Sequence, residues 1–210
     1  MSFAPAHRYC PACGSERLAW RVPEADDRQR QVCDHCGEIH YHNPRNVAGC
    51  ICEHAGRILL CRRAIEPRHG YWTVPAGFME NGESLAAAAA RETREEALAQ
   101  ARDLQLYALF NLPHINQVYV LFRAGVADGA AAAGPESLET AWFEPAELPW
   151  DELAFPVIHE GLRLYLNDRA AGHFPVHMGD IERTDTGLLV VRHHDGTEHP
   201  ARPDWRRGGR

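Results

Sequence analysis

The sequence contains no long apolar run and no excess of basic residues. No uninterrupted apolar stretch approaches the roughly 20 residues that a membrane-spanning helix needs. The N-terminal segment, MSFAPAHRYC, also lacks the apolar core of a secretory signal. The net charge is −7 and the pI is near 6.0, which argues against a nucleic-acid scaffold and a polybasic membrane patch. We therefore expect a cytoplasmic protein that binds neither membrane nor nucleic acid.

Internal repeats and low-complexity segments are also missing, which excludes solenoid and fibrous architectures. What remains is ordinary: 45% of the 210 residues are hydrophobic and 24% are charged, as in a soluble globular protein. This length suffices for one domain of usual size and a small appendage.

The seven cysteines fall into two groups. Four of them form two Cys-x2-Cys pairs separated by nineteen residues, which is the spacing of a four-thiolate zinc site: Cys10, Cys13, Cys33 and Cys36. A glycine follows each pair (Gly14 and Gly37) and suits a tight turn. The polar segment between the pairs cannot bury a core, so metal must supply most of the local stability. Cys50, Cys52 and Cys61 lie in apolar segments and are predicted to be small buried side chains.

Hydrophobic periodicity predicts a strand-rich region that contains two helices. Residues 47–54 and 57–63 form a hairpin in this interpretation, and Ser84 caps a helix that runs to about Ala101. Further strands are predicted over 104–112, 115–126 and 139–144, a second helix over 157–169, and one more hairpin over 187–199. The last five residues, RRGGR, are expected to be disordered.

Residues 77–96, GFMENGESLAAAAARETREE, combine a glycine turn, an alanine run and a crowd of acids. On a helix, Glu92 faces both Glu95 and Glu96, and each such pair of like charges costs a few tenths of a kcal/mol, on the order of 0.2–0.5. A hard divalent cation would offset this repulsion, because Mg2+ prefers carboxylate, phosphate and water oxygens.

Written as a pattern, this stretch reads G-x5-E-x7-R-E-x2-E-E and resembles the Nudix box through its paired glutamates. The resemblance implies a Nudix hydrolase of the α+β class, an α/β/α sandwich with a mixed β-sheet preceded by a zinc ribbon. The implied domains are a ribbon over 1–42, a Nudix domain over 43–172, and a C-terminal extension over 173–210 that is partly hairpin or disordered. The implied cofactors are catalytic Mg2+ or Mn2+ and structural Zn2+.

The resemblance also implies roles for the box residues. Glu95 and Glu96 would be metal ligands together with the carbonyl of Gly77, and Glu92 would be either a ligand or the base that activates water. Arg91 would pair with Glu83 and brace the loop against the helix. Some Nudix enzymes place the base in a later loop, where Glu136 and Glu139 are the candidates; both could equally be ordinary loop acids.

The box departs from the family pattern at its end. The family expects a glycine and then an aliphatic residue after the paired glutamates, where this chain has Leu98 and Ala99. Thr93 also replaces the usual aliphatic residue. These positions turn or pack the helix, so the departure concerns the geometry of the helix end rather than the activity.

A wider resemblance covers roughly residues 8–178, through IHYHNPRNVAGCI, LLCRRAIEPRHGYWTVPAGFMENGES and LFNLPHINQVYVLFRA. It is to bacterial relatives of the plant chloroplast Nudix hydrolase, which implies hydrolysis of FAD or ADP-ribose to two monophosphates and leaves a homodimer open. One alternative is an NADH/NAD-type pyrophosphatase. That group carries Ser-Gln-Pro-Trp-Pro-Phe-Pro after the box, where this chain has NLPHINQVYV. Another alternative is a non-catalytic regulator that senses a nucleotide.

Candidate substrate contacts lie around the box. Three arginines between a strand and the glycine loop are placed to meet phosphate, although each could be ordinary charged surface: Arg62, Arg63 and Arg68. Three aromatic residues could stack on a base, although isolated aromatics are more often core: Tyr71, Phe78 and Tyr119. His114 could contact substrate or cap a turn. His193, His194 and His199 have no partner carboxylate in the sequence pattern and are assigned to the tail.

Overall fold

The computed structural model describes residues 7–202. The chain divides into two compact units, and the boundary between them in the sequence follows Pro44. The expected disorder of RRGGR concerns residues outside this range. The first unit contains a three-stranded antiparallel sheet of β1 (Leu18–Arg21), β2 (Arg30–Cys33) and β3 (Ile39–His40). Its described core is small, with Cys10, Val32 and Cys33 buried. Such a core needs support from elsewhere, as the polar composition indicates.

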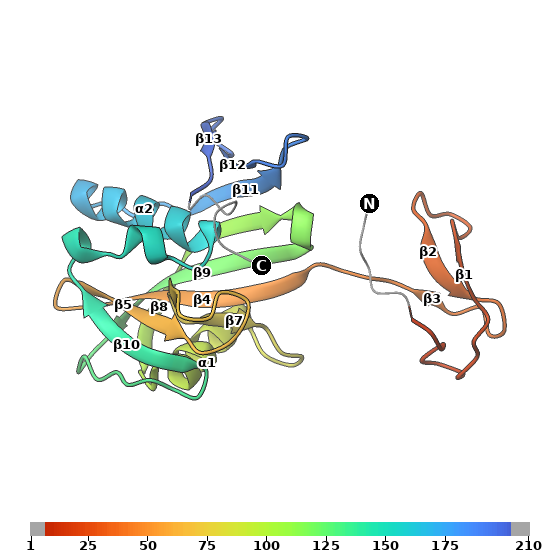
Figure 1. Ribbon diagram of the computed structural model, residues 1–210, viewed down its shortest axis with the longest axis horizontal. Coiled ribbons are helices and arrows are strands. Elements are labelled where there is room, and N and C mark those ends of the chain that lie inside the picture. Colours follow the sequence, from red (N-terminus) through yellow and green to blue (C-terminus); the bar gives the residue numbers. More distant parts are fainter. Residues whose placement is uncertain (1–6, 203–210) are drawn as a thin grey trace. The chain divides into compact units, whose positions relative to one another are not determined.

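The second unit is built on a ten-stranded mixed sheet, shown in Figure 1. Its long strands before the second helix are β4 (Arg45–His54), β5 (Arg57–Arg63), β8 (Ala101–Leu112), β9 (Gln117–Val126) and β10 (Ser137–Phe143), of which β10 lies at the edge. Two short strands, β6 (Trp72–Thr73) and β7 (Ala76–Phe78), pair with β5 and β4. The strands after the second helix are β11 (His177–Arg183), β12 (Leu189–His193) and β13 (Glu198–Pro200).

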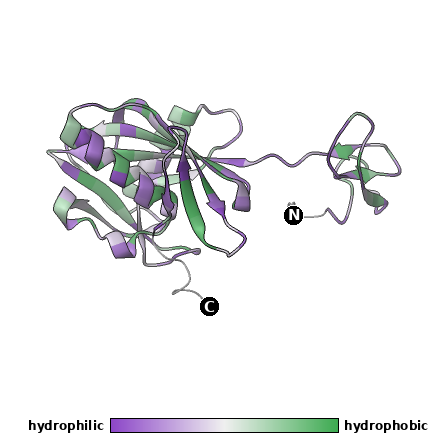
Figure 2. Ribbon diagram, turned by 90° about the horizontal axis from the view of Figure 1, so that it is seen from above, coloured by the Kyte–Doolittle hydropathy of each residue, from purple (hydrophilic) through white to green (hydrophobic). Residues whose placement is uncertain are grey.

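Alternation along the strands produces the layers. In β4, Val47 and Ile51 belong to one buried cluster, whereas Ala48, Cys50 and Cys52 belong to another. Helix α2 (Pro156–Ala171) packs into the first cluster, and α1 (Leu85–Ala97) packs into the second. Successive strand residues face opposite sides, so the sheet is covered by one helix on each face. Figure 2 shows the apolar residues gathered on the strands. The predicted α/β/α sandwich with a mixed sheet is confirmed.

The sheet is mixed because two of its pairings are parallel. β4 pairs with β9 in parallel from Arg45↔Gln117 to Glu53↔Gly125, and β8 pairs with β11 in parallel from His177↔Ala108 to Asp180↔Asn111. The neighbouring pairings, β4–β5, β8–β9 and β11–β12, are antiparallel. The second parallel pairing joins the strands after α2 to the same sheet, so the hairpin predicted over 187–199 forms as β12 and β13 within this unit.

Helix α1 begins where the sequence predicts and ends earlier. The Ser84 hydroxyl accepts a hydrogen bond from the Ala87 amide at 3.2 Å, which is the expected N-cap. The helix ends at Ala97 rather than near Ala101, because Leu98 adopts the left-handed conformation with φ of 48°. Its amide then donates to the Thr93 carbonyl, as in a glycine C-cap. The following residues, 101–112, are strand rather than helix.

Short 3-10 helices make the remaining connections: Pro113–Ile115 joins β8 to β9, and Pro145–Glu147 and Trp150–Glu152 lead into α2. None of the helices in the described range combines the length and the apolar character that crossing a bilayer requires.

Candidate active site and metal centre

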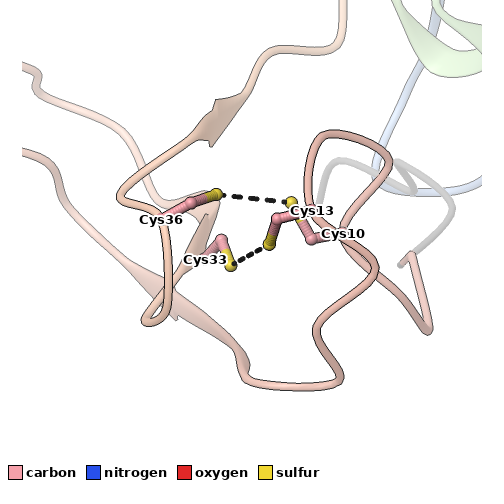
Figure 3. A group of neighbouring side chains, drawn as sticks. All are labelled: Cys10, Cys13, Cys33 and Cys36. Atoms are coloured by element: carbon pink, nitrogen blue, oxygen red, sulfur yellow. Dashed lines mark hydrogen bonds between the residues drawn. The ribbon is translucent and has the colours of Figure 1, made fainter.

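The four paired cysteines meet at one point in the first unit (Figure 3). The Sγ atoms of Cys10 and Cys36 lie 3.7 Å apart, and those of Cys13 and Cys33 lie 3.6 Å apart. A tetrahedral zinc ion with Zn–S bonds of about 2.3 Å requires sulfur–sulfur edges of about 3.8 Å. The thiols therefore stand close to the spacing that a single zinc ion would need, with no backbone rearrangement.

Two equivalent turns build this cluster. Gly14 donates its amide to the Cys10 carbonyl at 2.8 Å, and Gly37 donates to the Cys33 carbonyl at 2.9 Å. Both glycines have positive φ, 73° and 79°, which a side chain would disfavour. Within the cluster, the backbone amides of Cys36 and His35 lower the pKa of the Cys33 thiol, whereas the pKa values of Cys13 and Cys36 are raised beside the other thiols. A lowered pKa favours the thiolate, which is the form that binds metal.

Arg91 on α1 anchors the loop that precedes the helix. Its Nε and Nη2 donate to Glu83 at 3.1 and 2.7 Å, and Nη2 also donates to the Phe78 carbonyl at 3.0 Å. The Glu83 carboxylate in turn accepts the Glu80 amide at 2.6 Å. Arg91 lowers the pKa of Glu83 to about 2, so the pair stays charged. The pairing of Glu83 with Arg91 that the sequence predicts is present, and it fixes the loop to the helix.

Two box carboxylates are buried beside this loop. Glu92 is 9% exposed and Glu96 is 6% exposed, and Glu96 Oε2 accepts the Ala76 amide at 3.0 Å. Burial raises the pKa of Glu92, and it raises the pKa of Glu96 to about 8. The charge of Glu92 also raises the pKa of Glu96, and the charge of Glu95 raises the pKa of Glu92. A bound cation would favour the charged forms of both.

Gly77 lies directly against Glu92. A Cβ atom built on Gly77 would collide with the carboxylate of Glu92. The φ of Gly77 is not in the left-handed region, so close approach alone explains the absence of a side chain here. The backbone of β7 and the buried acids of α1 thus lie close together, and the ligands that they offer are oxygen atoms. Such a donor set fits Mg2+ or Mn2+, which take one or two carboxylates together with phosphates and waters.

Glu95 departs from the expected arrangement of three gathered acids. Its side chain is 51% exposed and its Oε2 accepts Arg91 Nη1 at 2.9 Å. The same Nη1 donates to Glu92 at 2.7 Å. Arg91 therefore offsets the repulsion between these two acids, a role that the sequence predicts for a divalent cation. Across the described residues, the oxygens of Glu92, Glu95 and Glu96 do not come within 4.8 Å of one another as a group. Glu95 is instead ion-paired with Arg91.

The loop before β10 closes the end of α1. Gly134 donates its amide to the Glu96 carbonyl at 3.0 Å, and Ala132 donates to the Ala97 carbonyl at 2.9 Å. A Cβ on Gly134 would collide with the Glu95 carbonyl, so the contact requires glycine. Sequence reasoning missed this role because nothing in a short Ala-Gly run indicates its distant partner.

The two loop acids predicted as alternative bases differ in their surroundings. Glu136 is exposed, and its charge contributes to the raised pKa of both Glu92 and Glu96, so it faces the buried acids. Glu139 lies 3.9 Å from Arg62 and is 52% exposed. Of these two acids, Glu136 is therefore the one with a resolved electrostatic effect on the box.

The arginines before the box shape a loop. Arg62 Nε donates to the Gly70 carbonyl at 2.9 Å, and Arg63 Nε donates to the Pro67 carbonyl at 2.8 Å. Arg63 is only 9% exposed and contacts the face of Phe155. Arg68 lies over the ring of Tyr71 at 5.4 Å. Arg62 and Arg63 therefore hold the loop, and Arg68 lies on the loop that they hold.

The predicted aromatic and histidine contacts separate in the structure. Phe78 is 43% exposed, with Arg45 over its ring at 4.4 Å. Tyr119 instead lies in the core at 8% exposure, so its ring offers no free face for stacking. Arg63 and Glu96 both affect its hydroxyl, whose pKa burial raises to about 12. His114 is half-buried and its Nδ1 lies 3.0 Å from the Ile181 carbonyl, so it joins the loop after β8 to β11.

A cavity of about 460 Å3 lies elsewhere in the second unit. Its lining comes from β4, β8, β9 and α2 and includes Glu53, Arg123 and Arg169. None of the box residues lines it, and we do not assign the chemistry to it.

Two family descriptions match the chain. The NUDIX domain matches residues 42–162, and the Nudix N-terminal zinc-ribbon family matches residues 8–42. Among curated proteins, NAD-capped RNA hydrolase NudC of Edwardsiella ictaluri is 33% identical over 151 residues, and that of Shigella flexneri is 32% identical over 150 residues. These alignments cover 70% of this chain and 55% of each relative, so the chain spans about half the length of the curated proteins it matches.

A solved structure agrees more closely. The crystal structure of a NUDIX hydrolase from Nitrosomonas europaea is 48% identical, with a TM-score of 0.79. The match covers 83% of this chain and 98% of the Nitrosomonas europaea chain. The matching domain occupies more than half of the sequence and includes the helix that carries the buried acids. The chain belongs to the Nudix hydrolase family.

Proposed function

We propose that this protein is a Mg2+- or Mn2+-dependent diphosphatase that hydrolyses nucleoside diphosphate derivatives, with FAD and ADP-ribose as the substrates to test first. The observation that supports this most directly is a pair of buried carboxylates beside β7: Glu92 lies against the backbone of Gly77, and Glu96 accepts the Ala76 amide. A purely structural helix would gain nothing from burying two acids whose pKa values burial raises.

The proposed ligands of the catalytic cation are Glu92, Glu95, Glu96 and the Gly77 carbonyl. Glu95 would leave Arg91 to join them, and its exposure allows that movement. When bound, the cation supplies charge neutralisation for the diphosphate and lowers the pKa of water. Arg91 and Glu83 hold the loop in place, and they take no part in proton transfer.

Glu136 is the proposed general base. Its carboxylate is exposed and its charge reaches both buried acids, whereas Glu139 is drawn toward Arg62. Glu92 is the less favoured base, because it is a proposed ligand of the cation and its Oε1 already accepts a hydrogen bond from Arg91. Water attacks one phosphorus and the bridging oxygen leaves with the other phosphate, so FAD gives FMN and AMP.

For substrate binding we propose Arg68 as a phosphate contact, with Phe78 and Tyr71 as stacking surfaces for an aromatic ring. Phe78 has the more exposed ring, and Arg45 already covers one of its faces. We propose that Arg62 and Arg63 act by fixing the loop that carries Arg68. Tyr119 and His114 are left out, because one is in the core and the other binds the Ile181 carbonyl.

For the cysteine cluster we propose a structural Zn2+ ion. The spacing of the four Sγ atoms supports it, as does the small size of the apolar core around them. The ion would hold the two glycine turns together.

A second candidate is a pyrophosphatase acting on NADH or NAD. The similarity to NAD-capped RNA hydrolases favours it, although it covers only about half of those proteins. The absence of the Ser-Gln-Pro-Trp-Pro-Phe-Pro signature weighs against it, since residues 111–120 read NLPHINQVYV. A nucleotide-sensing regulator without catalysis is the remaining alternative.

The deciding experiment is a substrate panel with Mg2+ or Mn2+: FAD, ADP-ribose, NADH, NAD-capped RNA and nucleoside triphosphates, with products separated by chromatography. We expect two monophosphates from FAD or ADP-ribose and a loss of at least a hundredfold in Glu96→Gln, since removing a charged ligand removes stabilisation of the transition state. Glu147→Gln, on an exposed 3-10 helix, is the matched control. Nucleotide binding without turnover of any substrate would leave the regulator as the answer.

A further inference from the structure

A second group of metal-ligating side chains lies between α2 and the C-terminal hairpin. Glu160 comes from α2, His193 from the end of β12 and His199 from β13. Glu160 Oε1 lies 2.8 Å from His193 Nε2 and 3.4 Å from His199 Nε2, and the three ligand atoms all lie within 4.8 Å of one another. None of these residues belongs to the box or to the cysteine cluster.

The burial of this group is unusual for its chemistry. Glu160 is 1% exposed and His193 is 9% exposed. Buried carboxylates normally require partners on every oxygen. Arg163 supplies two of them, with Nε donating to Oε2 at 3.1 Å and Nη2 donating to Oε1 at 2.6 Å. Oε1 therefore accepts one hydrogen bond from Arg163, while two imidazole nitrogens also lie within 3.4 Å of it.

His199 shows that hydrogen bonding alone does not complete the group. Its Nε2 is buried and has no hydrogen-bond partner, although Oε1 of Glu160 is only 3.4 Å away. An unsatisfied buried polar atom costs on the order of 1–3 kcal/mol, and native structures contain few of them. A ligand at this point would satisfy the atom.

The donor set and spacing fit a divalent transition metal. Two imidazole nitrogens and one carboxylate oxygen are ligands that zinc takes at about 2.0–2.2 Å, which places neighbouring tetrahedral ligands about 3.3 Å apart. The distances of 2.8 and 3.4 Å from Oε1 bracket that value. The ligand nitrogens of the two histidines lie within 4.8 Å of each other, so one ion is within reach of both imidazoles. Arg163 would then hold the carboxylate in position, as partners of metal-bound carboxylates commonly do.

The hairpin also places the two histidines correctly. β12 and β13 pair with Val191 opposite His199, and the turn between them closes through the Gly196 amide to the His193 carbonyl at 3.0 Å. The two imidazole rings lie 5.7 Å apart at 36°, on the side of the hairpin that faces Glu160. A metal bound here would fasten the last described strands to α2.

We propose that Glu160, His193 and His199 form a zinc site that clamps the β12–β13 hairpin onto α2 through Oε1 and two Nε2 atoms, with a fourth position left to water. The site is structural, and it is independent of the cation in the box and of the cysteine zinc.

Zinc content of the intact protein tests this directly. Wild type, His193→Ala/His199→Ala and His194→Ala are loaded with Zn2+ in excess Mg2+, freed of loose metal by gel filtration, and analysed by elemental mass spectrometry. We expect the double variant to hold one zinc fewer than wild type. His194→Ala, which changes the exposed neighbour of His193, should match wild type. Because the result is a difference, it does not depend on whether the cysteine cluster is occupied.

Cobalt substitution separates the two sites and checks folding. Co2+ bound to four thiolates gives intense charge-transfer absorption, whereas Co2+ bound to nitrogen and oxygen gives only weaker visible bands. The double variant should keep the thiolate absorption and lose the additional bands, and added Zn2+ should raise the melting temperature of wild type more than that of the double variant. Equal zinc content in wild type and the double variant, with the thiolate absorption intact in both, would overturn the proposal and identify the group as a hydrogen-bonded cluster.

Discussion

Arg91 binds Glu83 through two parallel hydrogen bonds, from Nε at 3.1 Å and from Nη2 at 2.7 Å. The same guanidinium reaches the Phe78 carbonyl and both Glu92 and Glu95. The guanidinium of Arg91 therefore fixes the glycine loop before α1 and two of the acids on the helix. Lysine, with a single ammonium group, cannot reproduce this set of contacts.

Arg91→Lys should accordingly damage catalysis more than folding. We expect kcat to fall about a hundredfold, because a displacement of about 1 Å in the loop is enough for such a loss. Steady-state kinetics on the best substrate of the panel measures it, together with circular dichroism to confirm the fold. Arg94→Lys on the exposed side of the same helix is the control and should keep full activity. An Arg91→Lys enzyme with normal kcat would show that the bidentate pair is dispensable.

Gly77 and Gly49 offer a contrast between a glycine that we propose to serve the cation site and a glycine that is needed for packing. A Cβ on Gly77 meets only the end of the Glu92 side chain, which can rotate away, whereas a Cβ on Gly49 meets the Pro75 carbonyl at 2.7 Å and the Ala76 backbone at 3.1 Å. Gly77→Ala should therefore lose activity at nearly unchanged stability, since it displaces one carboxylate. Gly49→Ala should lower the free energy of unfolding by about 1–3 kcal/mol, a typical overpacking cost.

Kinetics and urea denaturation on both glycine variants measure this pair of effects. The interpretation fails if Gly77→Ala retains wild-type kcat, or if Gly49→Ala unfolds at the wild-type urea concentration.

Leu98 occupies a position at which its family places glycine. With φ of 48°, its Cβ is strained, and a non-glycine residue in this conformation costs roughly 1–2 kcal/mol. The side chain is 55% exposed, so little packing is lost on its removal. Leu98→Gly should raise the free energy of unfolding by about 0.5–1 kcal/mol after allowance for the greater freedom of glycine in the unfolded chain. Leu98→Ala keeps the Cβ and should give no gain; equal urea midpoints for all three proteins would contradict the strain argument.

Local signals explain most of what the sequence predicted. Ser84 predicts the start of α1, and the glycines after each cysteine pair predict the turns. The resemblance of the box predicts the contact between Glu83 and Arg91. Each of these depends on residues close together in the chain, where spacing and backbone geometry are directly linked.

Contacts between distant segments were not predictable in the same way. The sequence pattern gives His193 and His199 no partner carboxylate, yet Glu160, which precedes His193 by 33 positions, contacts both of them. The parallel pairing of β11 with β8 creates that meeting by drawing the C-terminal hairpin onto the sheet. Leu98 illustrates another limit, since a leucine gives no sign of a left-handed backbone.

His114 should make stability depend on pH. Burial lowers its pKa below the ordinary value of 6.5, and Arg183 lowers it further. Below pH 6.5 the unfolded chain therefore binds the proton more readily than the folded one, so stability falls as the solution is acidified and recovers as the pH rises. In His114→Gln this contribution is absent, so the free energy of unfolding should decline less steeply between pH 7 and pH 5. The two slopes should differ by about the contribution of one titrating group. Urea titrations at several pH values measure the two slopes, and identical slopes would exclude His114 as a source.

Removal of zinc from the cysteine cluster should unfold the first unit without disturbing α1. The chain divides into two compact units, of which the first has a small buried core and the second has two large clusters around the sheet. Stability that comes from metal ligation disappears with the metal. Hydrogen exchange after treatment with a thiol-competitive chelator should show loss of protection at residues 10–40 and retained protection over Leu85–Ala97.

Cys13→Ser should reproduce the chelator's effect, whereas Cys61→Ser, a change at a buried cysteine in β5 outside the cluster, should leave residues 10–40 protected. Simultaneous loss of protection in both regions would show that the ribbon and the catalytic unit fold as one.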